Sequence, residues 1–366
     1  MSECLIIGGG ISGLLTALKL SEAGLKVTLL ESGKIGQESS WAGGGILSPL
    51  YPWRYPEPVT ALAHWSQIHY ADFTHALLQR TGIDPEYTRN GFLIIDIEEF
   101  AQAKAWATQH QCPLEKLEGV ALHDCESELG DYVTALWLPE IAQVRNPRLL
   151  KALKRALELT GVTFLENHAV RSLRQARDKI IGVETLAHGF IATEQVVITA
   201  GAWSALLLNS VNTKIAVKPV RGQMILFHTQ PGLVSRIILA DSHYVIPRRD
   251  GRVLAGSTLE EVGFDKTITP KALQDLKYKA FDLIPRLADY AVEKHWAGLR
   301  PGSPDGIPYI GKHPKIRGLY FNTGHFRNGI VLGLASAQLL ANIILEQPPI
   351  LEPSWYGLEK REGLNT

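Results

Sequence analysis

Three glycines near the N-terminus have the spacing of a turn that binds phosphate. Gly8, Gly10 and Gly13 form the pattern G-x-G-x-x-G between an apolar run, Cys4 to Ile7, and a segment with helical periodicity. In such a turn the first glycine permits a tight bend, the second lets the backbone approach a pyrophosphate, and the third lets the helix pack closely. The helix N-terminus adds amide donors and a partial positive charge. The pattern therefore predicts a dinucleotide site.

Glu31 supplies the acidic residue that this kind of site uses. It lies 18 residues after Gly13, at the end of a second apolar run. A carboxylate there can accept hydrogen bonds from ribose hydroxyls, and it repels a 2′-phosphate, which disfavours NADP. FAD and NAD share the adenosine diphosphate half, so the motif leaves the choice between them open.

The turn needs flanking elements, and the sequence supplies them. Cys4 to Ile7 predicts a strand, Ile11 to Ala23 a helix, and Val27 to Leu30 a second strand. A strand, a helix and a strand within about 30 residues predict a right-handed parallel crossover of the Rossmann type. Gln195 to Thr199 predicts a further strand that ends in Ala200 and Gly201. We therefore expect the nucleotide-binding domain to be discontinuous.

Other segments predict different local structure. Asp250-Gly251 between two β-prone runs, His243 to Ile246 and Val253 to Ser257, predicts a hairpin and so an antiparallel sheet. Asn146 to Leu159 predicts a helix with Asn146 as its N-cap. The apolar run Ile330 to Leu345 is short for a membrane span and holds polar residues, which favours a buried helix.

A loop rich in glycine, proline and aromatic residues runs from Gly43 to Pro58. Long loops in compact domains are often functional, and the aromatic residues argue against disorder. The loop could cover a binding site, or its rings could simply pack beneath it. The sequence leaves both interpretations open.

Composition excludes several classes of function. The 366 residues are 45% hydrophobic, enough for two domains with cores, and 37 basic residues balance 37 acidic ones. This balance disfavours nucleic acid and anionic membranes as partners. Cys4, Cys112 and Cys125 form no metal-binding pattern, so we expect a reducing compartment and no metal. Ser2 and Glu3 precede the first apolar run without a basic segment, which does not fit an export signal.

Several longer blocks resemble the D-amino acid oxidase family of FAD-dependent oxidoreductases, and within it the glycine-oxidising branch of the thiamine pathway. The resemblance extends over nearly the whole chain. The blocks are GGGISG with Glu31, ESSWAGGGILSPLYPWRY from Glu38, VRNPRLLKAL from Val144, ITAGAW from Ile198, PVRGQM from Pro219, YVIPRRDG from Tyr244, WAGLRPGSPDGIPYIG from Trp296 and GHFRNGIVL from Gly324.

The resemblance implies an α/β fold with two domains. A discontinuous Rossmann-type domain (residues 1–85, 145–215 and 301–366) would bind FAD, and an α+β domain with a mostly antiparallel sheet (86–144 and 216–300) would bind the substrate. Sarcosine oxidases attach flavin through a cysteine in the C-terminal half, but every cysteine here precedes residue 126. We therefore expect FAD to be bound noncovalently.

Residues are assigned to the cofactor by their match to the family motifs, Val170 through its backbone. They are Gly8, Gly10, Ile11, Ser12, Gly13, Glu31, Ser39, Ser40, Ala42, Gly43, Gly44, Gly45, Val170, Ala200, Gly201, Arg300, His325, Arg327, Asn328, Gly329 and Ile330.

Three residues are candidates for the chemistry. Arg300 matches the arginine that binds the substrate carboxylate, where a guanidinium fork stabilises the pair by about 1.5–3 kcal/mol. Tyr244 matches the tyrosine that supports this carboxylate, and Arg327 lies in the loop that the resemblance places beside the flavin. The helix after Arg327 would aim amides at the flavin and stabilise the negative charge of its reduced form. We interpret His325 as a structural hydrogen-bonding group, and we expect Tyr51, Trp53 and Met224 to border the substrate.

The resemblance implies hydride transfer from a deprotonated amino acid, glycine first, with sarcosine and D-alanine as alternatives. Oxygen would reoxidise the flavin and yield hydrogen peroxide, and the imine would give glyoxylate and ammonia or enter thiazole assembly. Two alternatives stay open: a D-amino acid or sarcosine dehydrogenase with another electron acceptor, and a nucleotide-binding regulatory protein without activity. We expect a cytoplasmic homo-oligomer, a tetramer by resemblance, with no nucleic acid or membrane partner.

Overall fold

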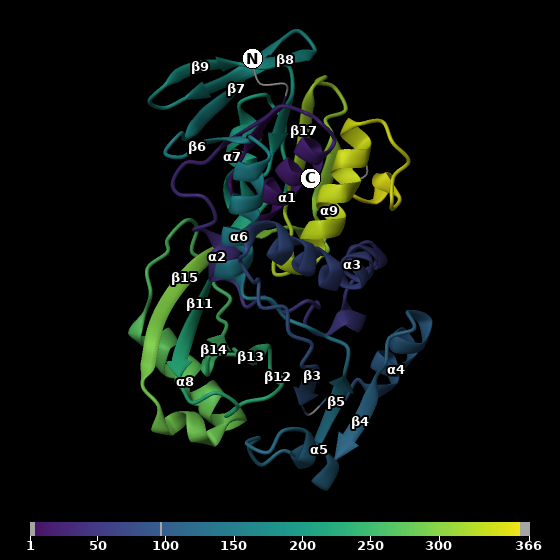
Figure 1. Ribbon diagram of the computed structural model, residues 1–366, viewed down its shortest axis with the longest axis vertical. Helices are drawn as coiled ribbons and strands as arrows, with labels where there is room; N and C mark the ends of the chain where they lie inside the picture. The colour runs from purple at the N-terminus through teal and green to yellow at the C-terminus, as the bar shows by residue number, and fades with distance from the viewer. Residues whose placement is uncertain (1–3, 96, 359–366) are drawn as a thin grey trace.

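The computed structural model describes residues 4–95 and 97–358, and its two large sheets lie in separate halves of the molecule (Figure 1). The first half contains a six-stranded sheet. Its strands are β1 (Cys4–Ile7), β2 (Val27–Leu30), β6 (Thr163–Leu165), β10 (Val196–Ile198), β16 (Tyr309–Lys312) and β17 (Leu319–Thr323). They lie in the order β16-β17-β10-β1-β2-β6, and all neighbours are parallel except β16 and β17. The Rossmann-type crossover from β1 to β2 is thus confirmed.

Helices on this sheet form the largest core of the protein. They are α1 (Ile11–Glu22), α3 (Glu57–Thr81), α6 (Asn146–Leu159) and α9 (Gly329–Ile344), whereas α7 (Ser204–Asn209) packs into a second, smaller core. Both α1 and α3 pack against α9 and α6. A Cβ at Gly333 of α9 would lie 2.9 Å from Leu15 Cδ1, so a glycine permits this close approach. Most of α9 is buried, which confirms the buried helix predicted there.

The second half contains an eight-stranded, mostly antiparallel sheet. Its strands are β3 (Phe92–Ile95), β4 (Glu115–Glu118), β5 (Thr134–Leu138), β11 (Lys218–His228), β12 (Ile237–Ala240), β13 (His243–Pro247), β14 (Arg252–Gly256) and β15 (Val292–Gly302). They lie in the order β15-β11-β14-β13-β12-β3-β5-β4, and β12 and β3 form its parallel pair. The hairpin β13–β14 turns at Asp250-Gly251, as predicted. The remaining helices are α2 (Ser39–Ala42), α4 (Phe100–Gln109), α5 (Val120–Cys125) and α8 (Pro270–Leu283). The predicted α/β architecture with a separate antiparallel sheet is confirmed.

Two local features differ from the sequence expectations. The protein also has a three-stranded sheet of β7 (Val170–Ala176), β8 (Lys179–Thr185) and β9 (Gly189–Ala192). The β-prone run Lys179 to Glu184 predicts its central strand, but the outer strands are largely exposed and lack apolar alternation, so the sequence does not predict them. The prediction that Asn146 caps its helix was wrong. Arg145 is the N-cap, and the Asn146 side chain donates to Ser40 O and Gly43 O instead. Among the described residues, no helix is long and apolar enough to cross a membrane.

Truncating the core side chain of Leu332 should destabilise the fold. Leu332 lies in α9 and is 0% exposed. We expect Leu332→Ala to lower the free energy of unfolding by about 2–5 kcal/mol because it leaves a cavity between packed helices. Urea denaturation measures this loss. Leu159→Ala at the end of α6, where the side chain is 51% exposed, is the control and should change the same quantity by no more than about 0.5 kcal/mol.

Candidate active site

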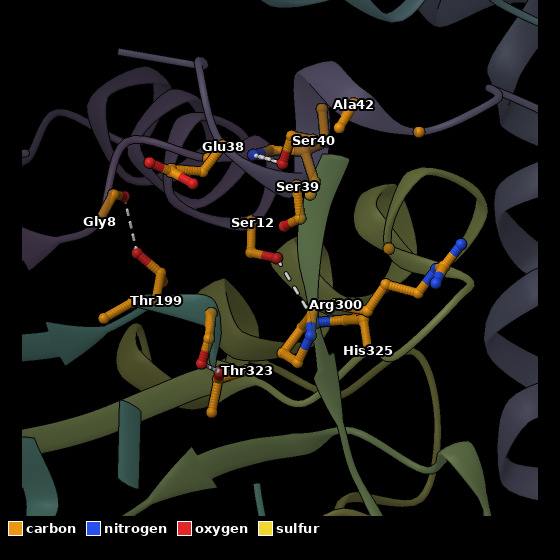
Figure 2. Close-up of a pocket in the computed structure, with 18 of the residues that line it drawn as sticks. Gly8, Ser12, Glu38, Ser39, Ser40, Ala42, Thr199, Arg300, Thr323 and His325 are labelled. Atoms are coloured by element: carbon orange, nitrogen blue, oxygen red, sulfur yellow. Dashed lines mark hydrogen bonds between the residues drawn. The ribbon is translucent and has the colours of Figure 1, made fainter. Parts of the chain in front are cut away.

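A cavity of about 520 Å³ is lined by residues of both large sheets. The residues that the sequence assigns to the cofactor or the substrate line this cavity, with the exception of Gly13, Tyr51 and Trp53. Figure 2 shows the labelled side chains reaching it from the N-terminal segment, from the end of β10 and from the C-terminal segment. The fold therefore brings the candidate residues together, although their individual roles remain predictions.

The phosphate-binding turn is built by close backbone contacts. Gly8 has a φ of 113°, and a Cβ there would lie 2.5 Å from Thr199 O. A Cβ at Gly13 would lie 1.9 Å from Gly8 O, so Gly13 packs behind the turn rather than facing the cavity. Thr199 Oγ1 lies 2.9 Å from the carbonyl oxygens of Ile7 and Gly8 and donates to them (Figure 2). The turn keeps its shape because strand β10 supports it.

Glu31 is held in place at the same end of the cavity. It is 8% exposed, and its carboxylate accepts hydrogen bonds from Gly9 N (2.8 Å), Gly33 N (2.9 Å) and Ser32 Oγ (2.9 Å). Val170 lies in the same lining. The carboxylate is therefore oriented before any ligand arrives.

The short helix α2 and the glycines after it form the second wall. Ser40 Oγ accepts a hydrogen bond from Ile11 N at the start of α1, at 2.9 Å. Asn146 Nδ2 donates to Ser40 O (2.8 Å) and Gly43 O (3.0 Å) from α6. Trp296 Nε1 of strand β15 donates to Ala42 O at 3.1 Å. This wall is thus bonded to both halves of the molecule.

Arg300 lies on strand β15 of the eight-stranded sheet, whereas Glu31 follows β2 of the six-stranded sheet. Its guanidinium donates to Thr258 O (3.0 Å) and to Ser257 Oγ (2.7 Å). A Cβ at Gly222 would lie 2.1 Å from Arg300 Nη1, so the guanidinium lies directly across that glycine of β11. Each terminal nitrogen carries a second hydrogen and can donate further. Desolvation lowers the pKa of Arg300, and the positive charge of Arg327 lowers it further, whereas Tyr244 opposes the shift.

Tyr244 and Met224 form an apolar wall beside Arg300. Tyr244 is 7% exposed, and its hydroxyl lies 3.7 Å from Met224 Sδ. The hydroxyl also interacts with the Arg300 guanidinium. The position of Tyr244 next to the arginine suits a shared carboxylate ligand.

The loop before α9 brings Arg327 into the lining. Phe326 N donates to Pro301 O at 3.0 Å, which ties the loop to the residue after Arg300. Among the described residues, Arg327 forms no hydrogen bond or ion pair with a side chain or a backbone group. Two guanidinium groups and the N-terminus of α9 therefore make this part of the cavity electropositive.

His325 is a neutral buried group. It is 2% exposed, its Nδ1 lies 3.5 Å from Ser12 Oγ, and its Nε2 has no partner among the described residues (Figure 2). Burial lowers the pKa of His325 to about 4. The imidazole can therefore donate or accept one hydrogen bond from the cavity without adding to its positive charge.

The aromatic loop packs differently from the expectation. Tyr51 and Trp53 do not line the cavity; Ser48, Leu50 and Met224 do. Trp53 Nε1 donates to Glu99 Oε2 at 2.6 Å, and Arg54 lies 3.9 Å from the centre of the Tyr51 ring. The two rings contact partners outside the cavity lining: the Trp53 ring bonds to Glu99, and the Tyr51 ring stacks with the Arg54 guanidinium. The sequence left open whether the loop covers a binding site or its rings pack beneath it. For Tyr51 and Trp53 the second interpretation holds.

Sequence reasoning missed several residues that shape the site. Gly222 lies within the block PVRGQM, and Arg248 lies within YVIPRRDG. The resemblance of these blocks to the family is the signal that could have identified both residues. Ser257 and Thr258 come to Arg300 through the course of the chain after β14, and nothing in their residue types indicated that contact.

The residues present fit FAD. Gly8 and Gly10 line the cavity and carry no side chain, so a pyrophosphate can approach their backbone. Three polar side-chain atoms at the cavity have no partner among the described residues: His325 Nε2, Asn328 Nδ2 and Asn322 Oδ1. Buried polar atoms are rarely left unpaired, so a polar ligand is expected to satisfy them. Residues around Gly8, Glu31 and Ser40 would hold the dinucleotide, and those around Gly44 and Asn328 the flavin ring.

Adding a methyl group at Gly13 should prevent cofactor binding. The new Cβ would lie 1.9 Å from Gly8 O, so the turn must move. We expect Gly13→Ala to purify with much less flavin absorbance per chain than the wild-type protein. The control is Gly357→Ala, where no heavy atom lies within 4 Å of the new Cβ. Equal flavin content in the two variants would contradict the role assigned to the turn.

Acid should destabilise the protein partly through His325. Its pKa is about 4 when folded and 6.5 when unperturbed, so the unfolded chain takes up this proton first as the pH falls. The free energy of unfolding should therefore decrease from about pH 6.5 to about pH 4, at up to ~1.4 kcal/mol per pH unit from this group. Denaturation curves of His325→Gln should lack this component of the slope. His123→Gln, at an exposed position, should keep the wild-type slope.

Comparisons with known proteins agree with this geometry. Residues 3–343 match the family model DAO, described as FAD dependent oxidoreductase. The chain is 46% identical to glycine oxidase from Pseudomonas putida over 99% of both chains. It is 32% identical to the bifunctional protein ThiO/ThiG of Trichormus variabilis, matching 100% of this chain and 56% of that one. The crystal structure of glycine oxidase from Geobacillus kaustophilus superposes with a TM-score of 0.92, at 27% identity and 98% coverage of each chain.

The family match covers almost the entire chain, and the Pseudomonas relative matches it from end to end. FAD is accordingly its cofactor, as the sequence predicts. The chain belongs to the DAO family of FAD-dependent oxidoreductases.

Proposed function

We propose that this protein oxidises the carbon–nitrogen bond of glycine and, more slowly, of sarcosine and small D-amino acids. The observation that carries the proposal is the partly buried Arg300 guanidinium, which faces the cavity beside Tyr244 with donor capacity left over. The similarity to glycine oxidases supports glycine as the substrate.

The residues around Arg300 would bind and orient the amino acid. Arg300 pairs with the carboxylate in a charge-assisted fork, and Tyr244 supports the same group from strand β13 of the same sheet. The Arg327 charge adds to the attraction for an anion. FAD, when bound, accepts the hydride that leaves the α-carbon. A carboxylate fixed at one end leaves the α-carbon and the amine to point into the rest of the cavity.

The substrate amine must arrive without its extra proton. Among the described residues that line the cavity, the acidic side chains are Glu31 and Glu38. Glu31 is engaged near the phosphate turn, and Glu38 pairs with Lys266 at 2.9 Å. Neither is placed to serve as a base beside Arg300. The electropositive surroundings disfavour an ammonium group and so favour the neutral amine.

We extend the proposal to the wider role of the protein. Oxygen as the electron acceptor would give hydrogen peroxide, with glyoxylate and ammonia from the imine. Similarity to a bifunctional ThiO/ThiG protein supports a part in thiamine biosynthesis. We also propose that the protein is a cytoplasmic homo-oligomer, and the family resemblance favours a tetramer.

We also propose the domain limits predicted from the sequence. The six-stranded sheet lies within 1–85, 145–215 and 301–366, and the eight-stranded sheet lies within 86–144 and 216–300 apart from the last two residues of β15. Residues 1–3, 96 and 359–366 of these ranges lie outside the described residues.

Anaerobic addition of glycine tests the proposal directly. The yellow flavin absorbance of the purified protein should bleach with glycine and return with oxygen, with peroxide formed in step. No bleaching by glycine, sarcosine or D-alanine would sink the proposal. Bleaching that oxygen fails to reverse would instead indicate another electron acceptor.

Replacing Arg300 should separate substrate binding from cofactor binding. We expect Arg300→Ala to raise the KM for glycine by at least about tenfold, since a charged hydrogen-bonded pair is lost, while FAD stays bound. Arg300→Lys keeps the positive charge but loses the two-pronged hydrogen bonding of the guanidinium, so its KM should lie between those of the wild-type protein and Arg300→Ala. Steady-state kinetics and the flavin content per chain measure both effects. An unchanged KM in Arg300→Ala would show that this side chain does not bind the substrate.

A further inference from the structure

Arg248 is a desolvated cation behind the cofactor wall, which is the wall of the cavity formed by α2 and the glycines after it. The proposed reaction makes no use of this side chain. It follows β13 and does not line the cavity. Its Nη2 donates to Gly44 O at 2.6 Å, and its Nη1 donates to Val144 O at 3.1 Å and to Gln143 Oε1. One side chain thus bonds to two separate segments of the chain, Gly44 in the cofactor wall and Gln143–Val144 before α6.

The same face of the hairpin strand carries Tyr244. Side chains alternate along a strand, so Tyr244, Ile246 and Arg248 extend to one side. A Cβ on Gly44 would lie 2.7 Å from Ile246 Cδ1 and 3.3 Å from Tyr244 Cε2. Gly44 therefore lies against the strand that holds the substrate tyrosine, and Arg248 bonds its carbonyl group.

This bond fixes the orientation of the next peptide group. In a trans peptide the C=O of Gly44 and the N–H of Gly45 point in opposite directions. Because the C=O is held by Arg248, the N–H of Gly45 points away from Arg248. Among the described residues this N–H donates no hydrogen bond, and Gly45 lines the cavity. The N–H is thus available to a ligand.

Arg248 remains charged under ordinary conditions. Desolvation is the main cause that lowers its pKa, to about 10, and the charge of Arg145 adds to it, while Glu86 and Asp250 oppose the shift. Arg145 is itself paired with Asp250 at 2.9 Å and with Glu86 at 3.2 Å. A desolvated cation is costly unless it is hydrogen-bonded, and the three acceptors of Arg248 meet that condition.

We propose that Arg248 is a positioning residue that fixes the Gly44–Gly45 peptide against strand β13. The wall formed by α2 and the glycines after it, and the side chain of Tyr244, then keep a fixed position relative to each other. Flavin retention and carboxylate binding then depend on a side chain that touches neither ligand. The part concerning the substrate rests on the proposed function; the part concerning flavin does not.

The experiment compares Arg248→Met and Arg248→Lys with the wild-type holoenzyme. Arg249→Met is the matched control, because Arg249 is the next residue and its side chain is 48% exposed, with Asp84 as its ion-pair partner. Release of flavin after dilution is followed by its fluorescence. Binding of acetate, a carboxylate without an amine, is followed by the change in the flavin spectrum. Thermal unfolding of each variant is recorded alongside.

We expect Arg248→Met to release flavin about tenfold more readily than the wild-type protein. The same variant should bind acetate about tenfold more weakly. Arg248→Lys should be intermediate, since an ammonium group cannot reach all three acceptors, and Arg249→Met should match the wild-type protein. A folded Arg248→Met with wild-type flavin release and acetate binding would overturn the proposal, as would full recovery by lysine. If the methionine variant does not fold, the lysine variant decides by the same two measurements. Wild-type protein that fails to bleach with glycine would refute the proposed function without affecting the flavin measurement.

Discussion

Repulsion between two guanidinium groups in one enclosed space is the constraint on which this site depends. Desolvation is the main cause that lowers the pKa of Arg300, and the nearby positive charge of Arg327 lowers it further. The N-termini of α1 and α9 open onto the same cavity and add partial positive charge. Such an arrangement is stable when anions occupy it, which suits a pyrophosphate at one place and a carboxylate at another.

The scaffold gives Arg300 and Arg248 fixed hydrogen-bond acceptors, whereas the Arg327 guanidinium has none among the described residues and is left for a ligand. Thr258 O and Ser257 Oγ accept from Arg300, and backbone carbonyls accept from Arg248. Burial lowers the pKa of His325 in the lining to about 4, so this ring stays neutral. The described lining therefore places fixed positive charge around Arg300 and Arg327, where a ligand can carry negative charge.

Much of the fold could be predicted from local patterns. The crossover from β1 to β2 follows from apolar runs around three glycines, and the hairpin β13–β14 follows from Asp250-Gly251. The outer strands β7 and β9 were missed because they are exposed on much of their length and carry no alternation. The role of Asn146 was misread because its helix start is buried under the cofactor wall, where the side chain serves another segment. Contacts such as Arg300 with Gly222 join residues on different strands, and their register cannot be read from a single sequence.

The strand order also governs when the chain can complete its dinucleotide fold during synthesis. Strand β1 pairs with β10, and β10 pairs with β17, so the sheet behind the first glycine turn includes residues 319–323. Helix α9, which covers α1, follows later still. A nascent chain therefore exposes the apolar faces of β1 and α1 until nearly all of it has left the ribosome. Cofactor capture becomes one of the last events of folding, and the unfinished N-terminal unit needs protection from aggregation until then.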